Sequence, residues 1–219
     1  SDVCSSDLGS TAFLSRQETV ACLPSVQVNG LRGGVKYWDG QFNDTKLALA
    51  LARSAALKGA LLLNYMRATR LLYTNEKISG LQCEDALTGQ AHEIHARCVV
   101  NATGVWVDAL REQDGTQQAM VAPSQGVHIV VDKKFLPGRA GLMIPKTADG
   151  RVLFAVPWLG SVILGTTDTP RDDLDKEPLA FEEEIDFILN ESARYLKRAP
   201  QRSDVKSIWV GLRPLVKPP

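Results

Sequence analysis

The segment Asn101-Ala102-Thr103-Gly104 has residue types that let a chain approach a flat or negatively charged group. Gly104 has no Cβ to block the approach, and the Thr103 hydroxyl and nearby amides can donate to phosphate or ribose oxygens. A β-branched run precedes the segment and an amphipathic stretch follows it, the order found where doubly wound sheets bind dinucleotides. An ordinary strand-to-helix turn shows the same pattern, so both interpretations stay open here.

His128 lies in an apolar run, two residues after Gly126. A glycine inside a strand permits a ligand to approach the backbone closely. A neutral imidazole at such a place can accept the proton of a substrate hydroxyl. The alternative interpretation is a hydrogen-bonded histidine of the core.

Two further segments end strands with groups suited to anions. The run Gly165-Thr166-Thr167-Asp168 offers two hydroxyls and a carboxylate. Arg213 lies in Gly-Leu-Arg-Pro, where its guanidinium fork fits a phosphate or a carboxylate. The alternatives are a turn held by side-chain caps and a structural ion pair.

The histidines and cysteines do not predict a metal site or a disulfide framework. His92 and His95 lie in an alternating segment without a third ligand nearby, which is typical of a solvated edge strand. The cysteines are scattered without a Cys-x-x-Cys pair, which indicates reduced, intracellular thiols. They are Cys4, Cys22, Cys83 and Cys98.

Composition excludes several classes of protein. The 219 residues include 25 Lys+Arg and 25 Asp+Glu, so the formal net charge is zero and no basic tract matches a nucleic-acid backbone. The apolar content of 44% is that of a globular protein. No apolar run approaches the roughly 18–20 residues that span a bilayer.

Both ends of the chain look artificial. Residues 1–8 show no periodicity and match the translation of a common sequencing adapter, so we interpret residues 1–10 as an artefactual leader. The last nine residues stop without a closing element. We therefore expect an internal fragment of a longer enzyme.

Local patterns predict three helices. Ser15 and Glu18 have the spacing of a capping box, which starts a short helix. Asn43 or Asp44 caps a second helix that runs to about Lys58. Its predicted buried face consists of Leu47, Leu51 and Ala55. The third, residues 181–199, is amphipathic, with an inward face and three acidic residues at its positive N-terminal end. These are Phe181, Ile185, Ile188 and Leu189, and Glu182, Glu183 and Glu184.

Strands are predicted in two groups. The first group leads into Ala-Thr-Gly and comprises residues 35–38, 61–64, 68–74, 77–85 and 92–100. The second group is short, alternating and broken by Gly and Pro, which is typical of an antiparallel sheet. It comprises residues 127–132, 140–144, 152–157, 161–166 and 205–210.

Taken together, these segments resemble the FAD-dependent glycerol-3-phosphate dehydrogenases of the membrane-associated, respiratory type. The matching segments follow the family's order from residue 11 onward: 14–19, 33–41, 101–108, 123–130, 149–154, 156–158, 165–170 and 211–215. Many flavoproteins share Ala-Thr-Gly, whereas the histidine strand with Gly-Thr-Thr-Asp and Gly-Leu-Arg-Pro is more specific. The family's N-terminal GxGxxG turn, an early arginine and a C-terminal glycine-rich stretch with a lysine are missing, which we attribute to truncation.

The resemblance implies an α/β plus α+β fold with two domains, like those of amino-acid oxidases and p-hydroxybenzoate hydroxylase. Residues 35–112 would form a partial, Rossmann-like FAD-binding domain, and residues 113–210 an antiparallel-sheet substrate domain. We expect residues 11–34 to pack on the substrate domain and residues 211–219 to return toward the FAD domain.

The implied reaction is oxidation of sn-glycerol 3-phosphate to dihydroxyacetone phosphate, with hydride transfer to FAD and electrons passing to a quinone. The implied location is cytoplasmic and peripheral on the inner membrane, and a homodimer is left open. The alternatives are an oxidase that uses oxygen, a related FAD amine or amino-acid oxidase, and a non-catalytic flavoprotein-like binding module.

The resemblance also implies roles for single residues. His128 would be the base or would orient the substrate hydroxyl, and Arg213 would bind the phosphate or the nascent C2 oxygen. Thr166 and Thr167 would add hydrogen bonds. The residues expected to contact FAD are Ala102, Thr103 and Gly104 at the ribose and pyrophosphate, and Ala68 at the adenine edge. No metal and no nucleic-acid partner are expected.

Overall fold

The computed structural model describes residues 9–116, 118–147 and 149–217, and the chain divides into two compact units. The first unit contains the chain up to Trp38 and again from Met120 onward, and the second contains Asp39–Ala119. Most of the predicted leader, residues 1–8, lies outside the described residues.

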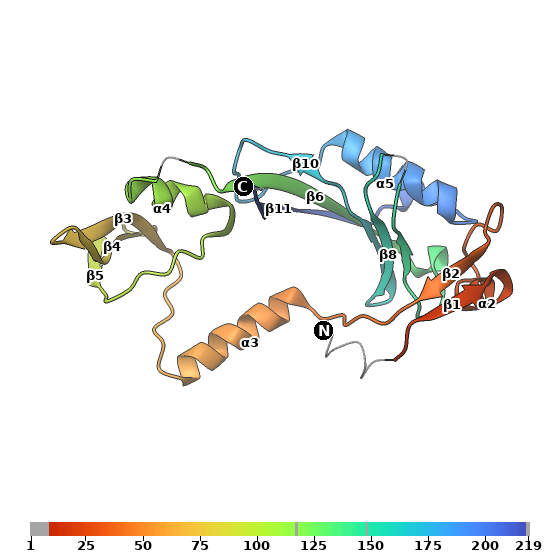
Figure 1. Ribbon diagram of the computed structural model, residues 1–219, viewed down its shortest axis with the longest axis horizontal. Helices are drawn as coiled ribbons and strands as arrows, with labels where there is room; N and C mark the ends of the chain where they lie inside the picture. The colour runs from red at the N-terminus through yellow and green to blue at the C-terminus, as the bar shows by residue number, and fades with distance from the viewer. Residues whose placement is uncertain (1–8, 117, 148, 218–219) are drawn as a thin grey trace. The chain divides into compact units, whose positions relative to one another are not determined.

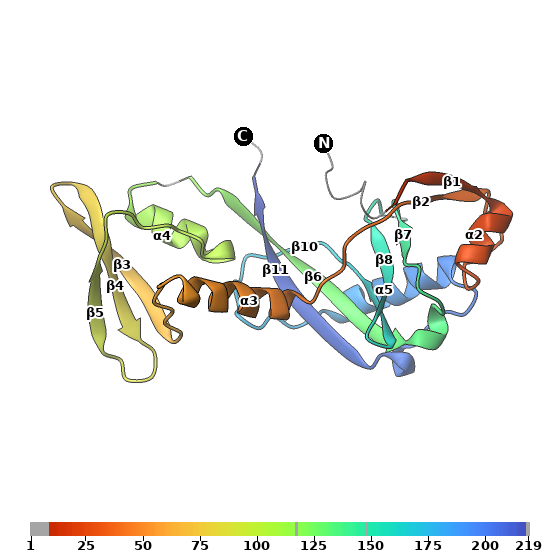
Figure 2. The same ribbon diagram turned by 90° about the horizontal axis from the view of Figure 1, so that it is seen from below.

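A six-stranded antiparallel sheet forms the body of the first unit (Figure 1). Its strands are β6 (Val121–Asp132), β7 (Leu142–Ile144), β8 (Leu153–Trp158), β9 (Ser161–Gly165), β10 (Thr169–Pro170) and β11 (Ser207–Val216). The strand β6 is central, with β9 and β10 along one side and β11 along the other. Figure 2 shows β6 and β11 running side by side, and their pairing includes residues 211–216. The predicted antiparallel sheet is confirmed.

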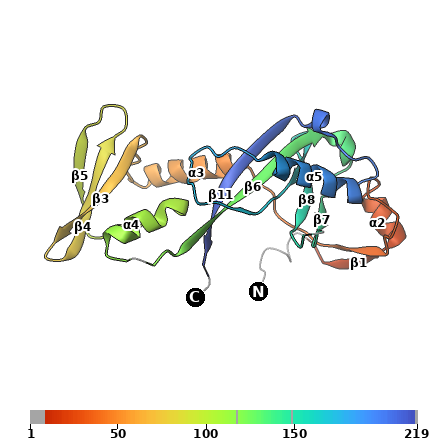
Figure 3. The same cartoon turned by 90° about the horizontal axis from the view of Figure 1, so that it is seen from above.

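Helix α5 (Glu182–Tyr195) covers one face of this sheet (Figure 3). Ile185 and Ile188 of the helix are buried against Val127, Ile129 and other apolar residues of the sheet. The inward face of the helix is confirmed for its three aliphatic residues. Phe181 was predicted wrongly, because it precedes the first turn and is 42% exposed.

A smaller substructure of the first unit contains β1 (Ala12–Ser15), α2 (Arg16–Cys22) and β2 (Gly33–Lys36). The predicted capping box is confirmed: the Glu18 amide donates to Ser15 Oγ at 3.3 Å, and the Ser15 amide donates to the Glu18 carboxylate at 2.7 Å. The Gln27 amide donates to the Tyr195 carbonyl at 2.7 Å, so the following loop is attached to the end of α5. Short 3-10 helices η2 (Lys133–Phe135) and η3 (Arg202–Asp204) complete the unit.

The second unit contains a three-stranded antiparallel meander and two helices. The elements are α3 (Asp44–Leu57), β3 (Met66–Thr74), β4 (Lys77–Asp85), β5 (Ala91–His95), the 3-10 helix η1 (Gly104–Trp106) and α4 (Val107–Gln113). Every residue of β5 is exposed and the strand lies at an edge of the meander. The prediction of a solvated edge strand at His92 and His95 is confirmed.

At the other edge of the meander, the side chain of Gln113 forms hydrogen bonds with the backbone of β3. The Leu71 amide donates to Gln113 Oε1 at 3.1 Å, and Gln113 Nε2 donates to the Thr69 carbonyl at 3.2 Å. The Tyr73 hydroxyl also reaches the Gln113 carbonyl, at 3.3 Å. The end of α4 is thereby attached to the edge of β3.

Three expectations for the second unit were wrong. Residues 61–64 and 96–100 form no strand, since a strand requires a ladder of hydrogen bonds to a neighbour and no described strand pairs with them; the Ala96 amide alone donates to the Ser79 carbonyl, at 2.9 Å. The predicted buried face of α3 is not buried: Leu47 is 44% and Leu51 63% exposed. The helix itself forms as predicted, and Asn43 is its N-cap, accepting from the Lys46 amide at 2.9 Å.

Candidate functional site

The face of the six-stranded sheet opposite α5 carries His128 and Arg213. Successive side chains of a strand point to opposite faces. Since Val127 and Ile129 pack in the core, His128 lies on the other face, directly across from Trp209 on β11 and Gly165 on β9. Arg213 lies four residues after Trp209, on the same face of β11, opposite Ser124.

Glycines make the room that these two side chains occupy. A Cβ added at Gly126 would lie 2.1 Å from Arg213 Nη2, and one added at Gly165 would lie 2.4 Å from His128 Cδ2. Real Cβ atoms do not approach other atoms so closely. The strand glycines noted in the sequence are therefore required by the placement of Arg213 and His128.

The loop after β9 fixes the Arg213 guanidinium. Arg213 Nη1 donates to the Thr167 carbonyl at 3.0 Å, and Nη2 donates to Thr166 Oγ1 at 2.7 Å. Nη1 also lies 3.8 Å from Asp168 Oδ1, an oxygen that accepts the Ser124 hydroxyl. Arg213 remains about one third exposed, so an anion from solvent can reach it.

His128 is an uncharged ring in this environment. Its imidazole stacks on the Trp209 ring with centroids 4.3 Å apart and an interplanar angle of 13°. Burial, and secondly the positive charge of Arg213, lower the pKa of His128 to about 4. His128 Nδ1 is buried without a hydrogen-bond partner in the described part of the chain, so a proton there would have no acceptor. A neutral imidazole beside a guanidinium can accept a proton from a bound anionic alcohol.

Thr166 and Thr167 have different positions. The Thr166 hydroxyl accepts from Arg213 on the outer face. Thr167 is fully buried, and its hydroxyl accepts from the Val127 amide at 2.9 Å and donates to Glu184 Oε1 at 3.0 Å. The Thr167 side chain therefore attaches this segment to β6 and α5, while the Thr167 carbonyl accepts a hydrogen bond from Arg213.

The residues predicted to contact FAD belong to the second unit. Gly104 has φ +61° at the start of η1, and a Cβ there would meet nothing within 4 Å. The Thr103 hydroxyl donates to Asn101 Oδ1 at 2.9 Å, and Asn101 Nδ2 donates to the Val107 carbonyl at 2.9 Å. Ala68 is exposed on β3, opposite Cys83. The turn therefore presents an exposed backbone of small residues, which fits close approach by a dinucleotide.

A family model of FAD-dependent oxidoreductases matches residues 3–219. The chain belongs to this family. The human mitochondrial glycerol-3-phosphate dehydrogenase is 42% identical over 221 residues, which cover 97% of this chain and 30% of that protein. The chain therefore spans less than a third of the length of this curated relative.

Solved structures of FAD-dependent oxidoreductases agree with this assignment. The glycerol-3-phosphate dehydrogenase of Bacillus halodurans, solved in complex with FAD, matches with a TM-score of 0.83 at 35% identity, over 94% of this chain and 42% of that chain. The glycine oxidase of Bacillus cereus matches with a TM-score of 0.74 at 23% identity, over 94% of this chain and 53% of that chain, which shows a shared fold. The predicted family resemblance and fold class are confirmed.

No metal centre is found in the described residues of this FAD-dependent oxidoreductase: they contain no cluster of three or more His, Cys, Asp or Glu placed to hold an ion. The described helices likewise include none long and apolar enough to cross a membrane. Three cysteines, Cys22, Cys83 and Cys98, are free thiols, and Cys4 lies outside the described residues.

Two residues of the site were missed from the sequence. Trp209 could have been found from the sequence, because it lies four residues before Arg213, and side chains four residues apart in a strand lie on the same face. Glu184 was interpreted only as a charge favourable to the helix N-terminus, yet it is 5% exposed and bonds to the loop that holds Arg213. Its local signal is its place as the third residue of α5, where a glutamate can accept from the amide that precedes the helix, but this position does not indicate burial or contact with the loop.

Gly126→Ala is expected to displace Arg213 without unfolding the sheet, because the three atoms nearest the added methyl all belong to the guanidinium at the far end of that long side chain. The Km for an anionic substrate should rise about tenfold or more, as expected when a charge-assisted hydrogen bond is lost. Steady-state kinetics of the enzyme from the complete gene would measure this.

Gly211→Ala is the matched control for Gly126→Ala. Gly211 pairs with Gly126 across the sheet, and a Cβ there would meet nothing within 4 Å. Equal effects of the two substitutions would show that neither β6 nor β11 tolerates a side chain at its glycine, and that Gly126 has no special relation to Arg213.

Proposed function

We propose that the enzyme containing this chain oxidises sn-glycerol 3-phosphate to dihydroxyacetone phosphate with FAD as its cofactor. The observation that carries the proposal is the pairing of a neutral His128 with a partly exposed Arg213 on one glycine-lined face of the sheet. The 42% identity to a glycerol-3-phosphate dehydrogenase supports the choice of substrate.

The chain's own residues supply proton transfer and anion binding in this proposal. Arg213 binds the phosphate or the oxygen on C2, and Thr166 supports the guanidinium. His128 accepts the proton of the C2 hydroxyl, so the O–H bond breaks as the carbonyl forms. Bound FAD would supply the acceptor for the C2 hydrogen and its electron pair, which balances the oxidation.

For the cofactor, we propose that Ala102, Thr103 and Gly104 lie against the FAD ribose and pyrophosphate, and that the backbone of Ala68 pairs with the adenine edge. The left-handed φ of Gly104 and the open space beside it support this placement. The assignment of residues 35–112 to cofactor binding and residues 113–210 to substrate binding is part of the same proposal.

Gly104→Ala is expected to weaken FAD binding, because the methyl enters the space assigned to the pyrophosphate and L residues are strained at φ +61°. Gly89→Ala is the matched control: its φ is +74°, its Cβ would also meet nothing within 4 Å, and it lies in the turn between β4 and β5. Flavin fluorescence titration of the two apo variants measures the difference. Equal FAD affinities would remove Gly104 from the cofactor site.

We further propose a quinone as the electron acceptor and peripheral attachment to the inner membrane from the cytoplasmic side. The relation to respiratory glycerol-3-phosphate dehydrogenases supports the quinone and the membrane. The human relative is named as mitochondrial, which applies to that protein.

A substrate panel on the enzyme from the complete gene tests the proposed reaction. sn-Glycerol 3-phosphate, glycerol, glycine and proline are compared while quinone reduction and oxygen consumption are both followed. Bleaching of the flavin by sn-glycerol 3-phosphate alone supports the proposal, and oxygen consumption in place of quinone reduction would identify an oxidase. Faster oxidation of an amino acid, or FAD binding without bleaching by any substrate, would overturn it.

A further inference from the structure

We propose that Glu184, on helix α5, is a positioning residue for Arg213 on the opposite face of the sheet. The kinetic part of its test rests on the proposed function, and the structural part does not. The connection between the two residues is the segment after β9, residues 166–169, whose last residue begins β10.

Alternate residues of this segment contact different side chains. Thr166 and Asp168 face Arg213: the Thr166 hydroxyl accepts from Nη2, and the Asp168 carboxylate lies within 3.8 Å of Nη1. Thr167 and Thr169 alternate with them and face Glu184, and their hydroxyls donate to Glu184 Oε1 at 3.0 and 2.7 Å. The loop therefore lies between the buried carboxylate and the guanidinium.

The second oxygen of Glu184 connects the loop to two further elements. Glu184 Oε2 accepts from Gln125 Nε2 on β6 at 2.7 Å and from the Phe181 amide at the start of α5 at 3.0 Å. Gln125 is fully buried and Glu184 is 5% exposed. One carboxylate thus fixes the loop relative to both the sheet and the helix.

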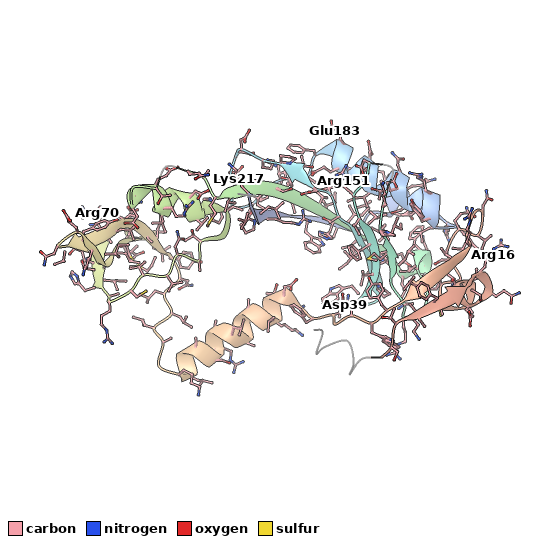
Figure 4. All side chains as sticks on the ribbon, in the orientation of Figure 1. Arg16, Asp39, Arg70, Arg151, Glu183 and Lys217 are labelled. Carbon is pink, nitrogen blue, oxygen red and sulfur yellow. The ribbon has the colours of Figure 1, made fainter. Side chains whose placement is uncertain are left out.

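The neighbouring acidic residues of α5 do not share this environment. Glu182 is exposed and pairs with Arg202 on the surface. Glu183 is exposed on the outer side of the helix, where Figure 4 labels it. A carboxylate that served only the helix N-terminus would need no burial, because an exposed position gives the same interaction.

Loss of a Glu184 acceptor leaves buried donors unsatisfied, which is costly unless the donors move. Gln125 is held in β6 and Thr169 in β10, which pair with each other, so residues 166–168 are the part of this network that can shift. Their movement also releases the Val127 amide from the Thr167 hydroxyl, and it takes the Thr167 carbonyl and the Thr166 hydroxyl away from Arg213. The expected result is a misplaced guanidinium in an otherwise folded protein.

The test compares Glu184→Gln with Glu191→Gln in the holoenzyme. Glu191 is a second buried carboxylate on α5, 6% exposed, which accepts a hydrogen bond from Arg194 at 2.8 Å. Glu184→Gln should raise the Km for sn-glycerol 3-phosphate about tenfold, the effect of one lost charge-assisted hydrogen bond, and lower kcat less. Its effect should be less than additive with that of Arg213→Lys. Glu191→Gln should leave the Km unchanged.

A crystal structure of the Glu184→Gln variant gives a readout independent of the substrate. The Arg213 guanidinium should no longer donate to both the Thr167 carbonyl and the Thr166 hydroxyl. An unchanged Arg213 in that crystal, or an effect fully additive with Arg213→Lys, would overturn the inference. If the wild-type enzyme does not oxidise sn-glycerol 3-phosphate, the proposed function fails and the crystal still decides the role of Glu184.

Thr169→Val provides a milder variant in case Glu184→Gln does not fold. It removes one hydroxyl from the loop and keeps the shape of the side chain. A smaller rise in Km, with a displaced Arg213 in the crystal, supports the inference. An Arg213 that keeps both hydrogen bonds in Thr169→Val overturns it.

Discussion

His128→Ala is expected to lower kcat by about 10²–10⁴-fold with a small change in Km, which is the effect of losing a general base. The imidazole is uncharged at neutral pH because burial and the nearby Arg213 disfavour its protonated form, so one ring nitrogen carries no proton and can serve as an acceptor. Stopped-flow measurement of flavin bleaching separates this step from reoxidation. His92→Ala is the control, because His92 is exposed on the edge strand β5.

The pH dependence gives an independent check on His128. Its pKa is lowered from 6.5 to about 4, so kcat/Km should be insensitive to this group above about pH 5 and should fall as the pH drops through about 4. The unfolded chain binds the proton more readily in this range, so the free energy of unfolding should decrease as the pH falls from 6.5 to 4. His128→Gln should remove that part of the pH dependence.

Two results would contradict the role of His128. A kcat for His128→Ala within a few fold of the wild-type value would make the imidazole structural. An NMR titration in which the His128 ring becomes protonated near pH 6.5 would show that burial and Arg213 do not control its charge.

Arg213→Ala is expected to lower kcat/Km by about 10²–10³-fold, the effect of removing a donor to a charged oxygen. The loss should be larger than for Gly126→Ala, because displacement leaves the positive charge near the site. Arg213→Lys should recover only part of the activity, since an ammonium cannot donate to the Thr166 hydroxyl, the Thr167 carbonyl and a substrate in the fork geometry of a guanidinium. Steady-state kinetics with sn-glycerol 3-phosphate measures all three.

Glycerol distinguishes the two roles open to Arg213. If Arg213 binds the phosphate, its loss affects sn-glycerol 3-phosphate but hardly affects the slow reaction of glycerol. If it stabilises the C2 oxygen, both substrates lose kcat. Arg202→Ala is the control, because Arg202 pairs with Glu182 on the surface. Near-normal kcat/Km in Arg213→Ala would remove Arg213 from the site.

Local sequence patterns predicted a helix cap and those strand segments that find a neighbour. The capping box at Ser15 and Glu18 formed, and β4 spans the predicted residues 77–85. Residues 61–64 and 96–100 have the composition of strands, but a strand also needs a hydrogen-bonded neighbour. The exposed apolar face of α3 shows the same limit: periodicity identifies a face suited to burial and does not supply what buries it.

The residues of the candidate site likewise differ in whether the local sequence indicates them. His128 and Arg213 were predicted from their residue types, and Gly126 was expected to let a ligand approach near His128. The structure instead gives the space at Gly126 to the Arg213 guanidinium, a relation between distant strands that the sequence does not show. Glu184 was not predicted, because its importance comes from contacts with residues 15 to 59 positions away. Buried hydrogen-bond networks between distant segments have no local signature.

The hydrogen bonds that Gln113 of α4 makes with the edge strand β3 also affect whether copies of the protein aggregate. An uncovered strand edge offers amides and carbonyls to any extended segment of another molecule, which is a route to aggregation. Gln113 engages the Leu71 amide and the Thr69 carbonyl, groups to which an added strand would bind. At the opposite edge β5 presents His92, Glu93 and His95 to solvent, and their polarity disfavours stacking of apolar strands. Both edge strands of the meander are therefore less open to pairing with a strand of another molecule.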